Sequence, residues 1–243
     1  MAIHEAYTRE MYDKYGYFAV WLPSVPLALG DVGTFTGHRF DKRTTLADLG
    51  VSFRISSASA RADVEYTSSG AVSLVADGAV GVTRSMPMAS LLITFSREGA
   101  TFFQGRECTE QSIDNVAGLE SALLPLCHNR TWRPNYVVVT SLVSTGPTMV
   151  LVSKDSGARV ELALDADGLG TPLPLAKAAG NFVVTAKSGL AASVMTPDGA
   201  TPLFRAACMR RKLLGGRELE IRGGERELDL ELAPVVWGDR VAV

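Results

Sequence analysis

The 243-residue sequence predicts an α+β fold, a twisted antiparallel β-sheet with flanking short helices. Apolar and polar residues alternate in short runs after position 135, separated by Gly- and Pro-containing turns, which is typical of antiparallel hairpins. Apolar residues within Cys108–Leu126 recur at helical spacing instead. Hydrophobic residues make up 47% and charged residues 21% of the chain, which favours a packed core over a disordered chain.

The N-terminal part predicts one short helix and several strands. Residues 5–15 have apolar side chains at roughly helical spacing, and Thr44–Gly50 predicts one or two helical turns, with Thr44 as N-cap and Gly50 at the stop. Gly70–Val82 fits either a short helix or a flexible strand, because its small apolar residues show no decisive period. Strands are predicted over Phe18–Leu22, Val32–Phe35, Ala62–Tyr66, Met86–Phe95 and Ala100–Phe103.

The C-terminal part predicts a helix followed by a β-meander. The helix covers Cys108–Leu126, and a Gly/Pro-rich loop spans Asp165–Gly180. Strands are predicted over Tyr136–Ser144, Thr148–Ser153, Arg159–Leu164, Asn181–Ala186, Leu190–Met195 and Leu203–Met209.

The last 31 residues, Leu213–Val243, differ from the rest in charge and pattern. They carry four arginines against seven acidic residues, a net charge of −3, whereas residues 1–212 carry +1. Glu218–Arg222 and Glu225–Leu232 alternate strictly around Gly223-Gly224, which predicts a hairpin. We therefore divide the chain into a body, residues 1–212, and a tail, residues 213–243.

Charge and cysteine content exclude several classes of protein. A net charge of −2 and a pI near 6.0 argue against a nucleic-acid partner of the usual basic kind. Three scattered cysteines predict a reduced, cytoplasmic protein without a disulfide framework. The charged N-terminus argues against a signal peptide, and no run of 18 apolar residues predicts a membrane-spanning helix. Membrane entry by β-hairpins stays open, because its signal is weak alternation.

No residue pattern predicts catalysis, a cofactor or a metal site. The histidines show no metal-ligand spacing, and we interpret them as surface residues: His4, His38 and His128. Cys127 and His128 are the one conceivable nucleophile pair, but neighbours at a helix end rarely face each other. We therefore expect that the protein is not an enzyme.

A basic cluster ends the body: Arg205, Arg210, Arg211 and Lys212. One interpretation is a solvated strand edge that prevents wrong pairing. The other is an exposed dibasic protease site or a contact for anionic lipid headgroups.

The order of elements resembles that of bacterial gasdermins over residues 5–212. The resemblance is carried by the LPSVPL segment (Leu22–Leu27), the LADLG turn (Leu46–Gly50), the YVVVTSLVSTGPTMVLV hairpin (136–152) and the closing TPLFRAACMR strand (201–210). Many members carry an acylated cysteine near the N-terminus, whereas the first cysteine here is Cys108.

The resemblance implies a gasdermin N-domain-like fold and an autoinhibited monomer in the cytoplasm. A caspase-like or trypsin-like protease would remove the tail, and the freed body would form a homo-oligomer that inserts hairpins into the lipids of the inner membrane, killing the cell in antiphage defence. The long hairpin regions, about 53–103 and 136–195, would be the inserting segments. Cleavage is expected near Arg210–Lys212 or, if Glu225–Leu232 is a permanent strand, at Arg226 or Arg240.

A second hypothesis is a non-enzymatic β-rich binding or scaffold domain. Its hairpins would be ordinary sheet, and removing the tail would unfold the protein. Leu228, Leu230 and Leu232 would each contribute roughly 1.5–3 kcal/mol if they are buried.

Overall fold

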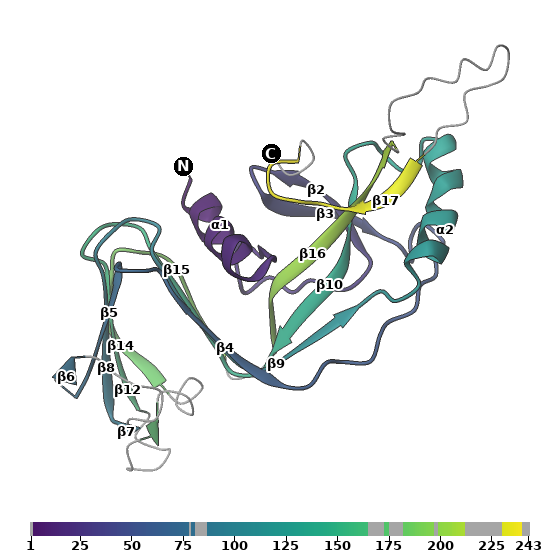
Figure 1. The fold of residues 1–243 in the computed structure, drawn as a ribbon. Coiled ribbons are helices and arrows are strands. Elements are labelled where there is room, and N and C mark those ends of the chain that lie inside the picture. Colours follow the sequence, from purple (N-terminus) through teal and green to yellow (C-terminus); the bar gives the residue numbers. More distant parts are fainter. Residues whose placement is uncertain are drawn as a thin grey trace, which may run out of the picture. The chain divides into compact units, whose positions relative to one another are not determined.

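The computed structural model describes residues 2–77, 79–80, 87–164, 173–174, 182–196, 199–211 and 230–239. The described chain is mostly antiparallel β-sheet with two helices, which confirms the predicted α+β class (Figure 1). The chain divides into two units, each with its own core. Unit 1 comprises Met1–Leu27, Ala58–Gln111 and Leu142–Phe204, and unit 2 comprises Ala28–Ser57, Ser112–Ser141 and Arg205–Val243.

The elements follow the chain in a mostly β order. The helices are α1 (Ile3–Tyr15) and α2 (Val116–His128). The strands are β1 (Phe18–Ala19), β2 (Asp31–Thr36), β3 (Arg39–Thr45), β4 (Ala62–Thr67), β5 (Val72–Ala76), β6 (Ala79–Val80), β7 (Pro87–Met88), β8 (Ser90–Phe95), β9 (Thr101–Ser112), β10 (Val137–Thr145), β11 (Thr148–Ser153), β12 (Arg159–Leu164), β13 (Leu173–Pro174), β14 (Phe182–Ser188), β15 (Leu190–Thr196), β16 (Ala200–Arg211) and β17 (Leu230–Pro234).

Helix α1 packs on the core of unit 1. It ends at Gly16, whose φ of 71° is left-handed and whose N–H donates to the Tyr12 carbonyl at 2.8 Å. Tyr7 and Met11 lie four residues apart, and therefore on one face of the helix, and both are fully buried. The predicted helix over residues 5–15 is thus confirmed, and it begins two residues earlier.

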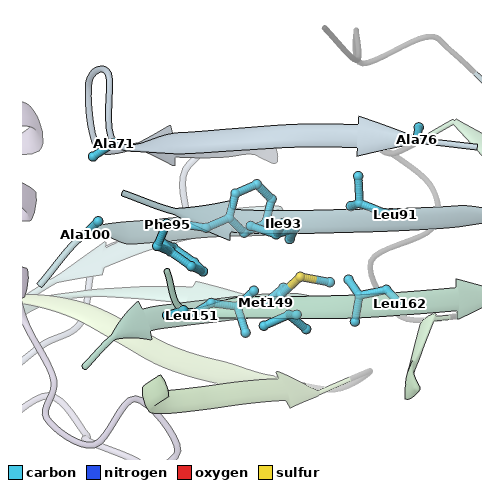
Figure 2. Packing of buried hydrophobic residues seen from close by; sticks show 12 residues of the cluster. Ala71, Ala76, Leu91, Ile93, Phe95, Ala100, Met149, Leu151 and Leu162 are labelled. Atoms are coloured by element: carbon cyan, nitrogen blue, oxygen red, sulfur yellow. The ribbon is translucent and has the colours of Figure 1, made fainter. Parts of the chain in front are cut away.

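The centre of unit 1 is strand β11, which pairs antiparallel with β9 and with β15. All six of its residues are buried. Strand β12 pairs with β8 and β14, and burial along β8 alternates, as the period-two pattern predicts. Figure 2 shows the apolar side chains of this core, among them Ile93 and Phe95 from β8 and Met149 and Leu151 from β11.

Unit 2 is a smaller assembly around helix α2. Strand β2 pairs with β3 and with the start of β10. Leu119 and Leu123 of α2 are fully buried and share a core cluster with Val32, Leu46 and Trp132. The apolar period that predicts this helix therefore marks the face that packs inward.

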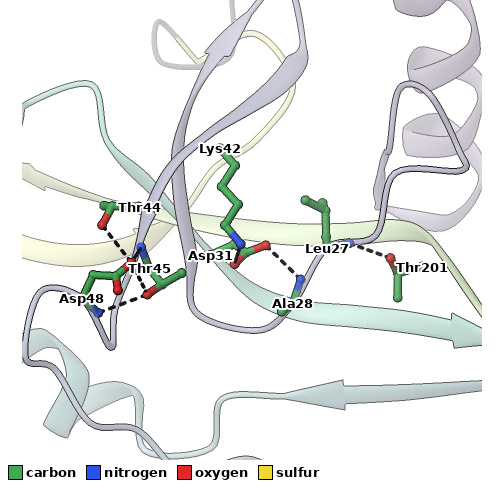
Figure 3. A network of polar contacts seen from close by, with 8 residues as sticks. All are labelled: Leu27, Ala28, Asp31, Lys42, Thr44, Thr45, Asp48 and Thr201. Carbon is green, nitrogen blue, oxygen red and sulfur yellow. Dashed lines mark hydrogen bonds and ion pairs between the residues drawn. The ribbon is translucent and has the colours of Figure 1, made fainter.

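Two aspartates organise the start of unit 2 (Figure 3). The buried Asp31 carboxylate accepts the Ala28 N–H at 3.0 Å and pairs with Lys42 Nζ at 2.7 Å, so the charge is neutralised where it is desolvated. The Asp48 carboxylate accepts the Thr45 N–H at 3.1 Å and the Thr45 hydroxyl at 2.8 Å. That side-chain hydrogen bond is the main reason why the pKa of Asp48 is lowered.

The turn predicted over Thr44–Gly50 is present, but its cap differs from the predicted one. Thr44 and Thr45 end strand β3, and overlapping hydrogen-bonded turns follow, in which the Leu49 N–H donates to the Thr45 and Leu46 carbonyls and the Gly50 N–H to the Ala47 carbonyl. Thr45 rather than Thr44 caps the turn, because its hydroxyl accepts the Asp48 N–H at 3.1 Å. Gly50 closes the turn with a φ of 71°, as its position predicts.

The prediction of a helix from Cys108 is wrong for its first eight residues. Cys108–Ser112 belong to strand β9, where Cys108 lies opposite Ala62 of β4. The helix begins only at Val116. Ile113 fits the helical period by coincidence, because strand pairing decides the conformation of this segment.

Two further expectations have different outcomes. Gly70–Val82, which the sequence leaves open, contains strands β5 and β6 and a turn at Asp77 with a φ of 46°. The hairpin predicted around Gly223-Gly224 lies outside the described residues except for Leu230–Leu232. The division at residue 212 stays a prediction.

Candidate functional site

Strand β17 lies antiparallel along the second half of β16. Their register runs from Ala207 opposite Pro234 to Arg211 opposite Leu230, five opposed residue pairs in all. Backbone groups at a strand edge attract another strand unless they are covered. The C-terminal segment therefore covers this part of the β16 edge.

Buried side chains also hold β17 and the residue after it against the rest of unit 2. Leu232, Ala233 and Val235 are only 9%, 4% and 5% exposed. Leu232 lies opposite Met209 and shares the α2 core cluster with it. The strand thus contributes apolar side chains to the core as well as backbone hydrogen bonds.

A carboxylate from α2 bonds the backbone of β17 directly. Glu120 Oε2 accepts the Leu232 N–H at 3.0 Å. The two groups are 112 positions apart in the chain. Since the acceptor is a carboxylate, this hydrogen bond is stronger than one to a neutral carbonyl group.

The described members of the predicted basic cluster lie on β16. Arg210 Nε and Glu231 Oε1 of β17 are 3.6 Å apart, and both side chains are well exposed, so their attraction is weak. No described carboxylate pairs with Arg211, and Arg205 is exposed on the same strand. The remaining predicted residues lie outside the described residues: Lys212, Arg226 and Arg240.

An aromatic contact follows the strand. The rings of His38 and Trp237 stack with centroids 3.8 Å apart and planes 5° from parallel. His38 occupies the turn between β2 and β3 with a φ of 63°. The segment after β17 therefore packs against the turn of the β2–β3 hairpin in unit 2.

Two of these contacts were not predicted from the sequence. Glu120 has the pattern of a solvated helix charge, His38 that of a surface residue, and Trp237 follows no motif. Each acts through a partner more than 100 positions away, so no local pattern marks it.

No group of three His, Cys, Asp or Glu side chains within the described residues could hold a metal ion. Burial raises the pKa of the Cys127 thiol, which keeps it protonated and weakens it as a nucleophile. None of the described helices is long and apolar enough to cross a membrane.

Comparison with solved structures finds a similarity of fold, whereas the sequence comparisons find none. No protein-family model and no curated protein sequence matches the chain. Among solved structures, the chain is similar to the cryo-EM structure of the Gasdermin A3 membrane pore, at 13% sequence identity. The match covers 94% of this chain and 99% of that chain, with a TM-score of 0.35.

Proposed function

We propose that this chain is a gasdermin-like pore-forming effector held inactive by its C-terminal strand. Proteolytic removal of β17 would free the body to oligomerise and to insert β-hairpins into the inner membrane, causing cell death in antiphage defence. The observation that carries the proposal is the pairing of β17 with β16.

Loss of β17 would change β16 in two ways. The backbone groups of residues 207–211 would lose their partners and become able to pair with another strand, such as one from a second copy. The apolar side chains now buried under β17 would gain exposure, among them Met209. Both changes favour self-association.

Loss of the tail would also change the net charge in a way that favours membrane binding. Loss of residues 213–243 would change the formal net charge from −2 to +1 and remove Glu231 from Arg210. An anionic membrane surface attracts each nearby cation by about 1 kcal/mol, so the change favours membrane approach.

The position of β17 discriminates among the candidate cleavage residues. Arg210 and Arg211 lie within the strand pairing, which would have to open before a protease could bind them in an extended form. A cut after Lys212 or Arg226 would separate β17 covalently from the body, whereas a cut after Arg240 would leave it attached. Lys212 and Arg226 are therefore the favoured sites for a caspase-like or trypsin-like protease.

A covalent cut would also weaken the strand pairing itself. While the chain is intact, β17 binds β16 as an intramolecular ligand, at an effective concentration in the millimolar range. After the cut, β17 belongs to a separate peptide, and dilution favours its dissociation from β16. Cleavage thus acts on the attachment without any other change in the chain.

The hairpin regions 53–103 and 136–195 would be the inserting segments. Burial along β8 alternates between buried and more exposed residues, which gives the strand two unlike faces. A strand of this kind can place one face toward lipid and the other toward a lumen.

The second candidate function, a β-rich binding or scaffold domain, is favoured by the burial of Leu232, Ala233 and Val235. Side chains buried to this extent are typical of a permanent strand. Under this function β17 never leaves β16.

A site-specific protease distinguishes the two functions. Its recognition sequence is inserted after Lys212 in one variant and after Arg240 in a matched control, and both full-length proteins are added to dye-loaded anionic liposomes. We expect dye release only after cutting the first variant. Circular dichroism follows folding, and a folded, cut protein that releases no dye would overturn pore formation.

A further inference from the structure

Two sheets of unit 1 are built from the same four segments of the chain. One sheet has the strand order β4-β9-β11-β15, and the other has the order β5-β8-β12-β14. Four bends join the strands of one sheet to those of the other, and we call them the bend row: residues 68–71, 96–100, 154–158 and 189. Each segment therefore keeps the same neighbours on both sides of the bend row.

Each bend contains one glycine in the left-handed region, with φ between 63° and 83°: Gly70, Gly99, Gly157 and Gly189. An extended strand needs a negative φ, so the sign of φ at these glycines turns the chain at the bend row. A Cβ atom at Gly70 or Gly157 would meet nothing within 4 Å. The backbone conformation, rather than a lack of space, therefore requires glycine at these two positions.

The two central segments keep their register through the bend row. Thr94 lies opposite Arg159 in one sheet, and Thr101 lies opposite Val152 in the other. Thr94 to Thr101 and Val152 to Arg159 both span seven positions. A slip of one residue would turn every side chain to the other face of the sheet, and straight pairing of these two segments requires no slip.

One carboxylate and two hydroxyl groups hold the bends together. The Ser68 hydroxyl donates to Glu10 Oε2 of α1 at 2.5 Å and accepts the Thr101 N–H at 2.7 Å. Glu10 Oε1 pairs with Arg97 Nη2 at 2.5 Å. The Ser153 hydroxyl, at the end of β11, donates to the Arg97 carbonyl at 2.7 Å. Through Glu10, helix α1 thus connects the β4–β5 bend to the β8–β9 bend.

The bent arrangement buries apolar side chains of both sheets in one core cluster (Figure 2). Ile93 and Leu162 come from one sheet, and Met149 and Leu151 come from the other, and all four are buried. Burial alternates along β8, so its buried side chains form one face of the sheet. Straightening of the four segments would uncover that face.

We propose that the four glycines of the bend row form a hinge on which the two sheets separate, and that Glu10 is the latch that keeps the hinge closed. When φ of each glycine becomes negative, β8 and β9 continue as one strand, and so do the other three pairs. The uncovered apolar face then needs an apolar environment, which a lipid surface supplies. This lipid step rests on the proposed function, whereas the hinge and its latch do not.

Oxidation of the intact, uncut protein by hydrogen peroxide, followed by peptide mass spectrometry, tests the hinge. Met149 is fully buried in the cluster that the two sheets share, and Met11 is equally buried in a different cluster of unit 1. Gly157→Val disfavours a positive φ and favours an extended backbone. We expect Met149 to be oxidised roughly fivefold to thirtyfold faster in this variant, and Met11 at an unchanged rate.

Two further variants separate the hinge from general strain. Gly50→Val is the matched control, because Gly50 has a φ of 71° and equally open surroundings but lies in unit 2. Glu10→Gln adds no backbone strain and removes the charge that pairs with Arg97. It should speed the oxidation of Met149 by roughly threefold to tenfold. Circular dichroism checks that each variant is folded.

Three results would overturn the hinge: unchanged oxidation of Met149 in both hinge variants, equal acceleration at Met11, or an equal effect of Gly50→Val. The lipid step has a separate measurement. Gly157→Val in the variant with the protease site after Lys212 should speed dye release once that chain is cut. Faster oxidation with unchanged dye release would overturn the lipid step and leave the hinge intact. No dye release from any cut variant would overturn the proposed function instead.

Discussion

The N-terminal and C-terminal attachments to β16 are built differently. In unit 1, β1 pairs with β16 over only two residues, Phe18 opposite Phe204 and Ala19 opposite Leu203. In unit 2, β17 pairs over five. The shorter pairing is compensated by side chains, because β1 follows a helix that is anchored in the core of unit 1.

That N-terminal anchor uses several kinds of contact. Tyr7 and Met11 are fully buried, and the buried Ala19 N–H donates to the Thr8 hydroxyl at 2.8 Å. Glu10 pairs with Arg97 at 2.5 Å at the rim. Such an attachment cannot open without exposing core side chains to water.

The C-terminal attachment depends more on the backbone. Apart from Leu232, its buried side chains are small or lie beyond the strand pairing, and its interstrand ion pair is long. A backbone pairing opens more readily than a packed core, because exposed hydrogen bonds can exchange with water. The difference suits a permanent N-terminal element and a releasable C-terminal one, and four measurements can break or sharpen the comparison.

The largest effect is expected from truncating the N-terminal anchor. Met11→Ala should lower the free energy of unfolding by about 2–5 kcal/mol, because it leaves a cavity in the core of unit 1. Urea denaturation followed by circular dichroism measures the loss. Lys14→Ala, exposed on the same helix, should change stability by less than about 0.5 kcal/mol. A small effect of Met11→Ala would mean that α1 is as releasable as β17.

Leu232→Ala tests the C-terminal attachment. We expect a loss of about 2–3 kcal/mol, expressed mainly as opening of β17 rather than as global unfolding. Cys208 is 3% exposed and lies opposite Ala233, so its labelling by iodoacetamide should become faster, while labelling of Cys108 in unit 1 stays slow. Val236→Ala, at an exposed position of the same segment, is the control. Equal acceleration at Cys108 would show that β17 opens only when the whole chain unfolds.

The thiol in the core behind α1 predicts a pH dependence. Burial raises the pKa of Cys108 from about 9 to about 11. The folded state therefore disfavours the thiolate. The contribution of the protonated thiol to the free energy of unfolding is fully present below pH 9 and is lost as the pH rises to 11. The loss should be about 2 kcal/mol. Denaturation of wild type and Cys108→Ala across this range measures it, and identical slopes would contradict the assignment.

The sequence predicts the local elements of this molecule better than its distant contacts. Turn residues and apolar runs identify β11 and β12 with their observed bounds. The predicted hairpin pairing is wrong for both strands, because β11 pairs with β9 and β15 and β12 with β8 and β14, none of which is its neighbour in the sequence. The helical period misassigns Cys108–Ser112, which belong to β9: Cys108 lies opposite Ala62 of β4, and the carbonyls of Glu110 and Ser112 accept the N–H groups of Ser59 and Ser56. The basic residues on β16 are visible in the sequence, but the Glu120 and Trp237 contacts that hold β17 are not, since their partners are far apart in the chain.

The smallest effect is expected from the ion pair across the two strands. Glu231→Gln removes a charge 3.6 Å from Arg210 on a well-exposed surface. The free energy of opening β17 away from β16 should therefore change by less than about 0.5 kcal/mol, and it should depend little on the salt concentration. Glu120→Gln is the matched comparison: it weakens a hydrogen bond to the Leu232 N–H and should favour opening by about 1 kcal/mol. Iodoacetamide labelling of Cys208 measures both. A larger effect of Glu231→Gln would assign the C-terminal attachment to electrostatics, and raised salt would then release β17 without any protease.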